Sequence, residues 1–298
     1  MLSVVITAWN EEKTLPQAVA SVKGLADEIV VVDTESTDGT IDVAKKLGCR
    51  VYKHKNTGIV EPVRNFSISK AQGDWVLLLD ADEELSPQLL DLIPRLISQG
   101  PDYFRIPRKN LIFGKWIRSR HWWPDYVFRL FKKGSVVWED TIHSVPSTRG
   151  IGVDLPADPE TCIVHHHYSS ISQYVQRIDR YTDHLLRHLQ DNGYKFSWAD
   201  LITKPSQEFI RQYFARGGYV DGLHGLALAC LQAFSETVLY LKAWESESFS
   251  QKELPLAEVA KNFSSVSKEY LWWDFQVNLD RSPAFLKPFL KLIRKISI

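Results

Sequence analysis

The feature that most constrains the fold is a regular alternation of short apolar runs with helical segments in the N-terminal third of the chain. The apolar runs have the length of buried strands, and the segments between them carry apolar residues at helical spacing. The expected strands are 2–8, 28–33, 50–53 and 75–79, and the expected helices are 11–25, 41–47 and 63–71. Because strands that alternate with helices build doubly wound sheets, this pattern predicts an α/β fold with a mainly parallel sheet and flanking helices.

Polar clusters stand at the ends of three of these strands. They cover residues 7–12, 33–38 and 80–84. In open parallel sheets, ligands bind beyond the carboxyl ends of the strands. We therefore expect one ligand site to be built from all three clusters.

The third cluster contains a pair of carboxylates, Asp80 and Asp82, directly after an apolar strand. Mg²⁺ and Mn²⁺ accept oxygen ligands of this kind, and a cation held there could neutralise a diphosphate leaving group. The pair also has a second interpretation as a helix N-cap, because acidic residues and Pro87 follow it.

The other two clusters also have two interpretations each. The run 33–40 is typical of a capped turn, and an acidic group at the strand end can also accept hydrogen bonds from a base or a ribose. Trp9 is either a core residue or a surface on which a nucleobase can stack.

The order and spacing of these segments are more specific than any one of them. TAWNEE, VVVDTESTDGT and VRNFSISKAQGDWVLLLDADEE resemble the inverting glycosyltransferases of family 2, which have the GT-A fold, over roughly residues 1–100. The resemblance implies a nucleotide-sugar donor, such as a UDP-sugar, and Mn²⁺ or Mg²⁺. It assigns the nucleobase pocket to Thr7 and Trp9, the ribose to Glu11, the base edge to Asp33, the nucleotide to Arg64, and ribose, metal and diphosphate to Asp80 and Asp82.

The middle of the chain narrows this resemblance. FGKWIR, WPD, RLF and IH, followed by HHHYSS, QRIDRYT and FARGGYVDGLHGL, look like bacterial lipopolysaccharide-core β-glucosyltransferases and, in part, like related peptide S-glucosyltransferases. One position departs from the pattern of this subgroup, because Ser144 stands where the subgroup has the glutamate of Val-His-Glu. A carboxylate there would be the natural general base. The substitute candidates are Glu139, Asp140 and Asp125.

Histidines supply candidates for a third metal ligand, since imidazole suits Mn²⁺. Among His165, His166 and His167, the last is favoured because it precedes the tyrosine position of the family. His143 is another candidate. The alternative for each of them is a hydrogen-bonded structural histidine.

Composition limits the classes of function. Lysine plus arginine and aspartate plus glutamate both number 36, so no global positive field favours nucleic acid. The 3 cysteines form no CxxC pair, which argues against a disulfide framework or structural zinc and indicates a reducing compartment. No secretory signal pattern is found, and the most apolar stretch, 223–241, carries polar residues and is expected to be a buried or interfacial helix. We expect a cytoplasmic protein, soluble or peripheral on the inner face of the cytoplasmic membrane.

Two further regions leave alternatives open. Residues 104–131 are rich in arginine and tryptophan. Such a segment can be an irregular packed connection, a single-stranded nucleic-acid site, or a site for a saccharide acceptor with anionic groups. The donor-site resemblance favours the saccharide acceptor. The tail 283–298 is amphipathic and basic, and such a helix can lie on an anionic bilayer. Packing on the body of the protein or on a second subunit, as in a homo-oligomer, is the alternative.

Together these patterns predict a Rossmann-like GT-A domain over 1–155 and a mainly helical region over 156–298. The expected reaction moves a hexose, glucose by resemblance, from a UDP-sugar to a lipopolysaccharide-core or lipid-linked saccharide, with inversion. The alternatives are a peptide S- or O-glycosyltransferase and a catalytically inactive nucleotide-sugar-binding protein. Nucleic acid is not an expected partner.

Overall fold

The apolar runs of the N-terminal segment form the parallel half of a mixed sheet. β3 (Arg50–Lys53), β2 (Glu28–Asp33), β1 (Leu2–Ala8) and β4 (Trp75–Asp80) lie side by side in that order and are all parallel. The central strands are buried on both faces, as expected for a parallel sheet covered by helices. The sequence-based strand ranges are confirmed, with β4 continuing into Asp80.

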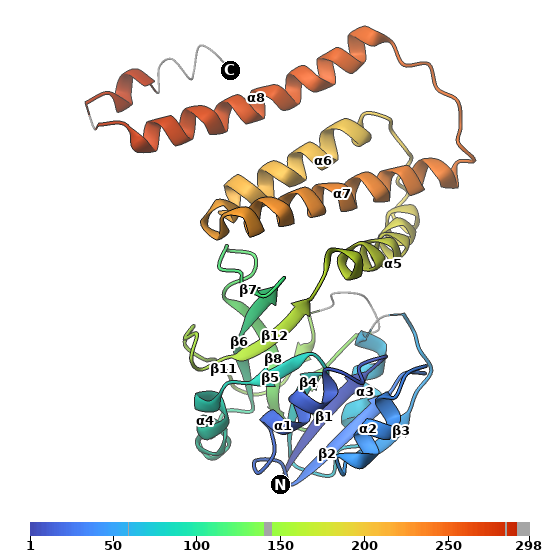
Figure 1. Ribbon diagram of the computed structural model, residues 1–298, viewed down its shortest axis with the longest axis vertical. Helices are drawn as coiled ribbons and strands as arrows, with labels where there is room; N and C mark the ends of the chain where they lie inside the picture. Colours follow the sequence, from blue (N-terminus) through green and yellow to red (C-terminus); the bar gives the residue numbers. More distant parts are fainter. Residues whose placement is uncertain (59, 140–144, 284, 291–298) are drawn as a thin grey trace. The chain divides into compact units, whose positions relative to one another are not determined.

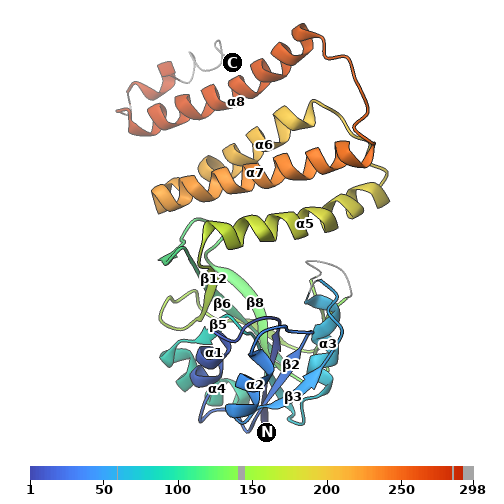
Figure 2. The same cartoon turned by 45° about the vertical axis from the view of Figure 1, so that its right-hand side comes forward.

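The computed structural model describes residues 1–298 except 59, 140–144, 284 and 291–298. The chain divides into two units, of which unit 1 comprises residues 1–117 and 122–169, and unit 2 comprises residues 118–121 and 170–298. Figures 1 and 2 show the elements of each unit. The boundary expected at 155 falls too early, because a later strand of unit 1, β12 (Ile163–Tyr168), pairs with the sheet.

The remaining strands extend the sheet beyond β4 in mixed directions. β8 (Asp125–Lys132) is antiparallel to β4, β6 (Tyr103–Ile112) is antiparallel to β8, β12 is parallel to β6, and β5 (Glu83–Leu85) is antiparallel to β12. The short strands β7 (Lys115–Trp116) and β11 (Gly152–Asp154) also pair with β6, and β9 (Val136–Val137) pairs with β10 (Ser147–Thr148). The segment 104–131 therefore contributes the antiparallel part of the sheet.

Helices cover both faces of this sheet, as side-chain alternation along β1 requires. Val4 and Ile6 join an apolar core with α1 (Leu15–Ser21), α2 (Thr40–Lys46) and α4 (Pro87–Ser98). Val5 joins a second core with α3 (Glu61–Ser69) on the opposite face. The flanking helices of the predicted fold are thus present (Figure 1).

The first helix is shorter than the sequence predicts, and this changes where Glu11 lies. α1 begins at Leu15, with a proline in its first turn, rather than at Glu11. Residues 11–14 form the connection from β1, and the Glu11 N–H donates to Thr40 Oγ1 at 2.8 Å. Glu11 therefore belongs to the loop at the carboxyl edge of the sheet.

Unit 2 is helical. It contains α5 (Ile171–Asp191), α6 (Asp200–Ile210), the π-helical turn η1 (Arg211–Ala215), the 3-10 turn η2 (Gly218–Asp221), α7 (Leu223–Ser246) and α8 (Leu256–Arg281). The apolar stretch 223–241, expected to be helical, lies in α7. α6 continues through Pro205 and packs against α7.

One helix in the described part of the chain, α7, is long and apolar enough to cross a membrane by length and composition. Of its most apolar window, 28% is buried in the structure, where α7 contacts α5 and α6. A core helix of a globular unit meets the same criterion but is mostly buried, which this window is not. Of the predicted amphipathic tail 283–298, residues 284 and 291–298 lie outside the described residues, and the side chains of Phe285 and Phe289 are exposed.

Candidate active site

The carboxyl ends of β2, β1 and β4 bring the predicted donor-site residues to one edge of the sheet. The pairing register sets Ala8 opposite Asp33 and Thr7 opposite Asp80. Paired strands are only about 4.8 Å apart. The acidic clusters after β2 and β4 therefore flank the end of β1, as the strand pattern predicts.

Asp33 is buried at this edge and has one unsatisfied oxygen. Its Oδ2 accepts a hydrogen bond from the Ser36 N–H at 3.1 Å, whereas Oδ1 has no hydrogen-bond partner in the described structure. A buried carboxylate oxygen without a donor is costly, so this atom fits a donor that a ligand supplies. Trp9, just beyond β1, is 39% exposed and belongs to the same edge.

Asp80 lies between two arginines. Arg64 Nη2 is 3.3 Å from both of its carboxylate oxygens, and Arg129 forms an ion pair with Oδ2. Burial by itself raises the pKa of Asp80, but the charges of Arg129 and Arg64 outweigh it and hold that pKa well below its usual range. A cation bound to Asp80 would share its carboxylate with these two arginines. Asp82 is therefore the more available metal ligand of the pair.

Helix α3 fixes one wall of the site. The Arg64 guanidinium lies 5.5 Å from the ring centroid of Trp138. The next residue, Asn65, holds the Trp138 backbone, donating to its carbonyl at 2.7 Å and accepting from its N–H at 3.1 Å. Thr7 faces the same helix, with its Oγ1 3.1 Å from Ser67 Oγ.

Asp82 faces β12 and does not cap a helix. Its Oδ2 lies 3.3 Å from His165 Nε2, and the N-cap of α4 is Ser86, whose Oγ accepts from the Leu89 N–H. Burial raises the pKa of Asp82, but the charge and the hydrogen bond of His165 lower it below its usual value. The helix-cap interpretation of the Asp-x-Asp pair is therefore wrong for Asp82.

The three histidines of β12 make different contacts. Nδ1 of His167 lies 3.0 Å from Nε2 of His165, the nitrogen that also faces Asp82. His166 instead lies 2.9 Å from Glu84 through its Nε2. The structure thus places His167 close to the Asp-x-Asp pair and directs His166 to a different carboxylate. His143 lies outside the described residues.

Asn110 connects His165 to Asp125. Its Nδ2 donates to Asp125 Oδ2 at 3.0 Å and to the Trp122 carbonyl at 3.1 Å, so its Oδ1 accepts from His165 Nδ1 at 2.6 Å. Arg108 Nη2 is 2.7 Å from the same Asp125 oxygen. Burial raises the pKa of Asp125, but the Arg108 charge and the hydrogen bond from Asn110 lower it below its usual value. Asp125 is a paired carboxylate, which weakens it as a base.

Glu83 and Arg129 form the buried centre of this network, a role that the sequence pattern does not predict for either residue. Arg129 Nη2 is 2.8 Å from Glu83 Oε1, and Arg108 Nη1 is 2.9 Å from the same oxygen. The other oxygen of Glu83 accepts from the Asp80 N–H at 3.0 Å. One sequence feature could have indicated this network: Arg129 stands in the middle of an apolar strand, and an arginine is rarely fully buried unless it is paired.

The remaining base candidates are adjacent in the sequence. Asp140 and residues 142–144, which include Ser144, are outside the described residues. Glu139 is described and exposed, and it directly follows Trp138.

Glu11 has an unusual proton affinity. Burial raises its pKa to about 7; the hydrogen bond from Thr14 lowers it in part, and the negative charge of Asp82 raises it further. The repulsion from Asp82 is felt because the loop after β1 holds Glu11 at the same edge of the sheet. The structure therefore gathers six predicted donor-site residues, namely Thr7, Trp9, Glu11, Asp33, Arg64 and Asp80.

The residues present suit a cation that a ligand helps to coordinate. Within the described ranges, no three His, Cys, Asp or Glu side chains form a complete metal site. Mg²⁺ commonly takes one or two carboxylates, with phosphate oxygens and water completing its shell. Asp80 and Asp82, with His167 nearby, fit that incomplete set.

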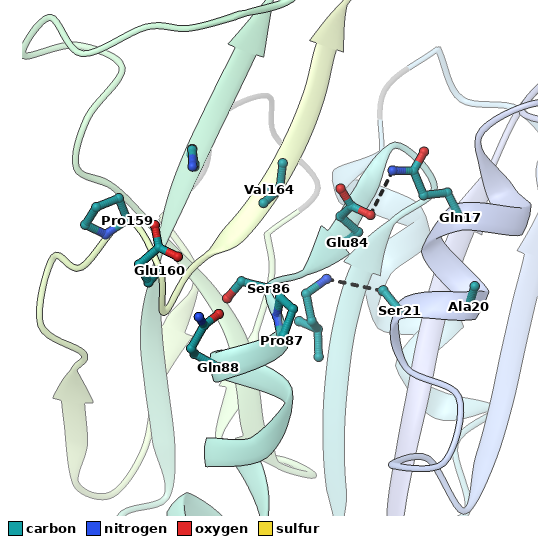
Figure 3. A pocket seen from close by; sticks show the side chains of 12 residues that line it. Gln17, Ala20, Ser21, Glu84, Ser86, Pro87, Gln88, Pro159, Glu160 and Val164 are labelled. Atoms are coloured by element: carbon teal, nitrogen blue, oxygen red, sulfur yellow. Dashed lines mark hydrogen bonds between the residues drawn. The ribbon is translucent and has the colours of Figure 1, made fainter.

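A separate cavity of about 470 Å³ lies beside β5 (Figure 3). Gln17 from α1 donates to Glu84 at 2.8 Å in its wall, and the start of α4 and β12 complete it. Successive strand residues point to opposite faces, so Glu84 faces this cavity while Glu83 faces Asp80. Glu84 of the predicted cluster 80–84 and Lys109 of the segment 104–131 line this cavity, whereas none of the residues assigned individually to the donor, the metal or the base does.

A parallel half-sheet with acidic clusters at its carboxyl edge, extended by antiparallel strands, is the architecture of the GT-A glycosyltransferases. The glycosyl transferase family 2 profile matches residues 3–150. An uncharacterized glycosyltransferase of Rickettsia typhi is 33% identical over 254 residues, which cover 82% of this chain and 87% of the relative. The chain belongs to glycosyltransferase family 2.

Other similarities are weaker. The lipopolysaccharide core biosynthesis glycosyltransferase LpsC of Rhizobium meliloti is 23% identical over 254 residues, covering 78% of this chain and 90% of LpsC. The crystal structure of S. aureus TarS 1–349 in complex with UDP aligns with a TM-score of 0.45 and 16% identity, over 85% of this chain and 93% of that one.

Proposed function

We propose that this chain transfers a hexose, glucose by resemblance, from a UDP-sugar to a saccharide acceptor, with inversion at the anomeric carbon. The observation that carries the proposal is the strand register, which sets Thr7 opposite Asp80 and Ala8 opposite Asp33. In this proposal Asp33 Oδ1 accepts from the nucleobase, Trp9 stacks on it, and Glu11 meets the ribose.

The proposed cofactor is Mn²⁺ or Mg²⁺, held by Asp82 with Asp80 and His167. When bound, such a cation neutralises the charge that develops on the departing diphosphate. Asp80 remains ionised because Arg129 and Arg64 lower its pKa. Arg64 also sits where it can approach the nucleotide phosphates.

The general base is proposed to be Glu139, which would take the proton of the acceptor hydroxyl as its oxygen attacks. Asp125 is a weaker candidate, because Arg108 and Asn110 both bind its Oδ2. Glu139 directly follows Trp138, whose backbone is fixed by Asn65. Asp140 stays a prediction outside the described residues.

The acceptor is proposed to be a lipopolysaccharide-core or other lipid-linked saccharide bound by the segment 104–131. In this segment the rings of Trp116 and Trp123 meet edge to face at 5.2 Å, and the Lys109 ammonium lies 5.0 Å from the Trp116 ring. Aromatic faces and cations of this kind suit a sugar with anionic groups. The named role of the relative LpsC in lipopolysaccharide core biosynthesis supports this acceptor class. A cytoplasmic site of action and peripheral membrane contact through the tail are further parts of the proposal.

The test combines binding with turnover. UDP and UDP-glucose, each with Mn²⁺, are expected to raise the melting temperature more than GDP-mannose does. UDP-glucose consumption should occur with octyl β-D-glucoside or a deacylated lipopolysaccharide core, and not with a cysteine peptide. Asp82→Ala should lower the rate of UDP-glucose consumption by about 100-fold or more. The matched control is Glu84→Ala, which removes a carboxylate on the cavity side of the same strand.

Three results would redirect the proposal. Binding of UDP with no donor consumed would favour the inactive sugar-nucleotide-binding protein. Transfer to the cysteine peptide alone would favour the peptide S-glucosyltransferase. Equal activity of Asp82→Ala and wild type would remove the metal from the mechanism.

A further inference from the structure

Two loops of unit 1 that carry predicted donor-site residues are joined to each other by hydrogen bonds. The β1 loop, 9–14, connects β1 to α1, and the β2 loop, 34–40, runs from β2 to the first residue of α2. Three successive backbone N–H groups of the β1 loop donate to side chains of the β2 loop. The pairs are Asn10 with Ser36 Oγ at 2.9 Å, Glu11 with Thr40 Oγ1 at 2.8 Å, and Glu12 with Asp38 Oδ2 at 3.2 Å.

Asn10 adds side-chain contacts to this junction and has an uncommon backbone conformation. Its φ is 57°, in the left-handed region that asparagine adopts more readily than most residues other than glycine. Its Oδ1 accepts from the Thr37 N–H at 2.7 Å and from the hydroxyl of the same residue at 3.3 Å. Because its own N–H donates to Ser36, Asn10 binds two neighbouring residues of the β2 loop.

Glu12 binds the other end of the β2 loop. Its Oε2 accepts from the Gly39 N–H at 2.8 Å. A Cβ atom at position 39 would lie only 2.7 Å from that oxygen, so a larger residue there would displace the carboxylate. Side chains of the β1 loop therefore bind the β2 loop at both 37 and 39.

Stability alone does not account for the conformation of Asn10. Its side chain is exposed, and hydrogen bonds that compete with water make only a modest net contribution to stability. A residue other than glycine at positive φ costs free energy, and backbone strain of this kind is concentrated at ligand sites. The conformation of Asn10 at the carboxyl edge of the sheet therefore indicates a role in binding.

The junction lies between the two residues to which the proposed function assigns the nucleobase. Trp9 directly precedes Asn10 in the β1 loop. Ser36, which accepts from Asn10, donates its own N–H to Asp33 Oδ2 at 3.1 Å. The other oxygen of Asp33, Oδ1, is the proposed acceptor for the base. Asn10 and Ser36 thus connect both sides of the proposed base pocket.

We propose that Asn10 is a positioning residue for the nucleobase of the donor. By binding Ser36 and Thr37, it fixes the Trp9 ring relative to Asp33 Oδ1 before the nucleotide arrives. A pocket whose loops are already ordered binds more tightly, because less conformational entropy is lost on binding. The inference rests on the proposed function, and Asn10 needs no contact with the nucleotide.

Two substitutions separate the amide of Asn10 from its backbone conformation. Glycine adopts a φ near 57° without strain, so Asn10→Gly keeps the course of the loop but loses both hydrogen bonds from Thr37. Asn10→Asp keeps an oxygen acceptor at the same place and tolerates the same φ. It is therefore the conservative variant that should retain the function of the wild-type residue.

Calorimetric titration of the full chain with two ligands tests the proposal. UDP with Mn²⁺ is expected to occupy the base pocket and the Asp-x-Asp pair, whereas pyrophosphate with Mn²⁺ is expected to occupy only the pair. Asn10→Gly should weaken UDP binding about tenfold and leave pyrophosphate binding unchanged. Asn10→Asp should stay within about threefold of wild type for UDP. Amide exchange at residues 36 and 37 should be faster in Asn10→Gly.

The matched control is Asp158→Gly in the loop before β12, also in unit 1. Asp158 makes the same kind of contact, because its carboxylate accepts from the Glu160 N–H and from the Thr161 hydroxyl, each at 3.0 Å. It belongs to neither loop of the junction. The control should speed exchange at 160–161 and change neither ligand affinity. If it weakens UDP binding as much as Asn10→Gly does, the loss of any loop contact explains the effect and the proposal is wrong.

The remaining outcomes distinguish this inference from the proposed function. If wild-type protein binds UDP and Asn10→Gly binds it equally well, the positioning role is wrong while the proposed function stands. An equal loss of UDP and pyrophosphate affinity also overturns the positioning role, because the base pocket would not be the part affected. If wild-type protein does not bind UDP, the proposed function fails, and the role of Asn10 fails with it.

Discussion

Charged residues are used differently in the two units of this chain. In unit 1, Arg129 and Glu83 are each 1% exposed and pair with one another and with the first aspartate of the Asp-x-Asp pair. In unit 2, Lys242 joins α7 to α5 through Asp179 and Asp183, whose side chains are 73% and 51% exposed. Desolvation makes a buried ion pair expensive, whereas an exposed pair costs and contributes little.

The difference indicates what each set of charges is for. Apolar residues of similar size would often fill a buried site at no loss of stability, so a buried ionic network is weak evidence of a stabilising role. At the edge of the sheet, these charges orient the carboxylates that the proposed mechanism needs. In unit 2, the pairs of Lys242 with Asp179 and Asp183 join α7 to α5 and so support helix packing.

Arg129→Met gives the strongest test of this comparison. It leaves the buried carboxylate of Glu83 and the partly buried carboxylate of Asp80 short of a positive partner, so the free energy of unfolding should fall by about 3–5 kcal/mol. Urea denaturation measures it. The matched control is Arg105→Met, which breaks an ion pair with Asp154 whose two side chains are 41% and 42% exposed and should cost less than about 1 kcal/mol. Equal losses would contradict the contrast between buried and exposed pairs.

The pH dependence of stability gives the next largest effect. Because burial raises the pKa of Glu11 from 4.5 to about 7, the folded chain binds this proton more tightly than the unfolded chain does. The free energy of unfolding should therefore decrease as pH rises through that range, by about 2–3 kcal/mol from this group. Urea denaturation at pH 5 and pH 8 in EDTA should show a smaller decrease in Glu11→Gln than in wild type. Parallel pH profiles would show that Glu11 is not buried among the carboxylates.

Trp9→Ala separates binding from stability at the same edge. The ring is 39% exposed, so its loss should change the free energy of unfolding by only about 0.5 kcal/mol. Loss of stacking on the nucleobase should weaken UDP binding by about 1–3 kcal/mol. Calorimetric titration with UDP and Mn²⁺ measures the second quantity. Unchanged affinity would place the base elsewhere.

Lys242→Ala should have the smallest effect. Its partners are exposed, so unfolding should become easier by less than about 1 kcal/mol, and salt should reduce the difference further. UDP affinity should not change. A loss above about 2 kcal/mol would mean that the ion pairs of unit 2 carry more of its stability than exposed pairs usually do.

Local patterns were sufficient for the parallel half of the sheet and for the residues at its edge. Buried strands and amphipathic helices have distinct periods, and each of the three polar clusters follows a strand directly in the sequence. The positions of Asp33, Asp80 and Asp82 at one edge followed from this alternation. The start of α1 at Leu15 was missed, although the apolar residues at helical spacing begin there; the polar residues 11–14 before it form a turn.

The tertiary structure decided the partners of these residues. Glu83 looks like one more exposed acid until β5 pairs with β12 and turns it toward Arg129. Asp125 looks like a free base until Arg108 and Asn110 bind it. Such pairs join residues that are far apart in the sequence, so the local periodicity of the sequence does not predict them.

The sequence by itself determined the family, the ranges of β1 to β4 and the edge at which a donor would bind, because each depends on short segments whose patterns are local. The tertiary structure alone decided which charges are buried together, which histidine approaches Asp82, and that Asn10 binds residues 36 and 37. The physical reason is that burial and pairing depend on contacts between distant segments, and these exist only once the chain has folded.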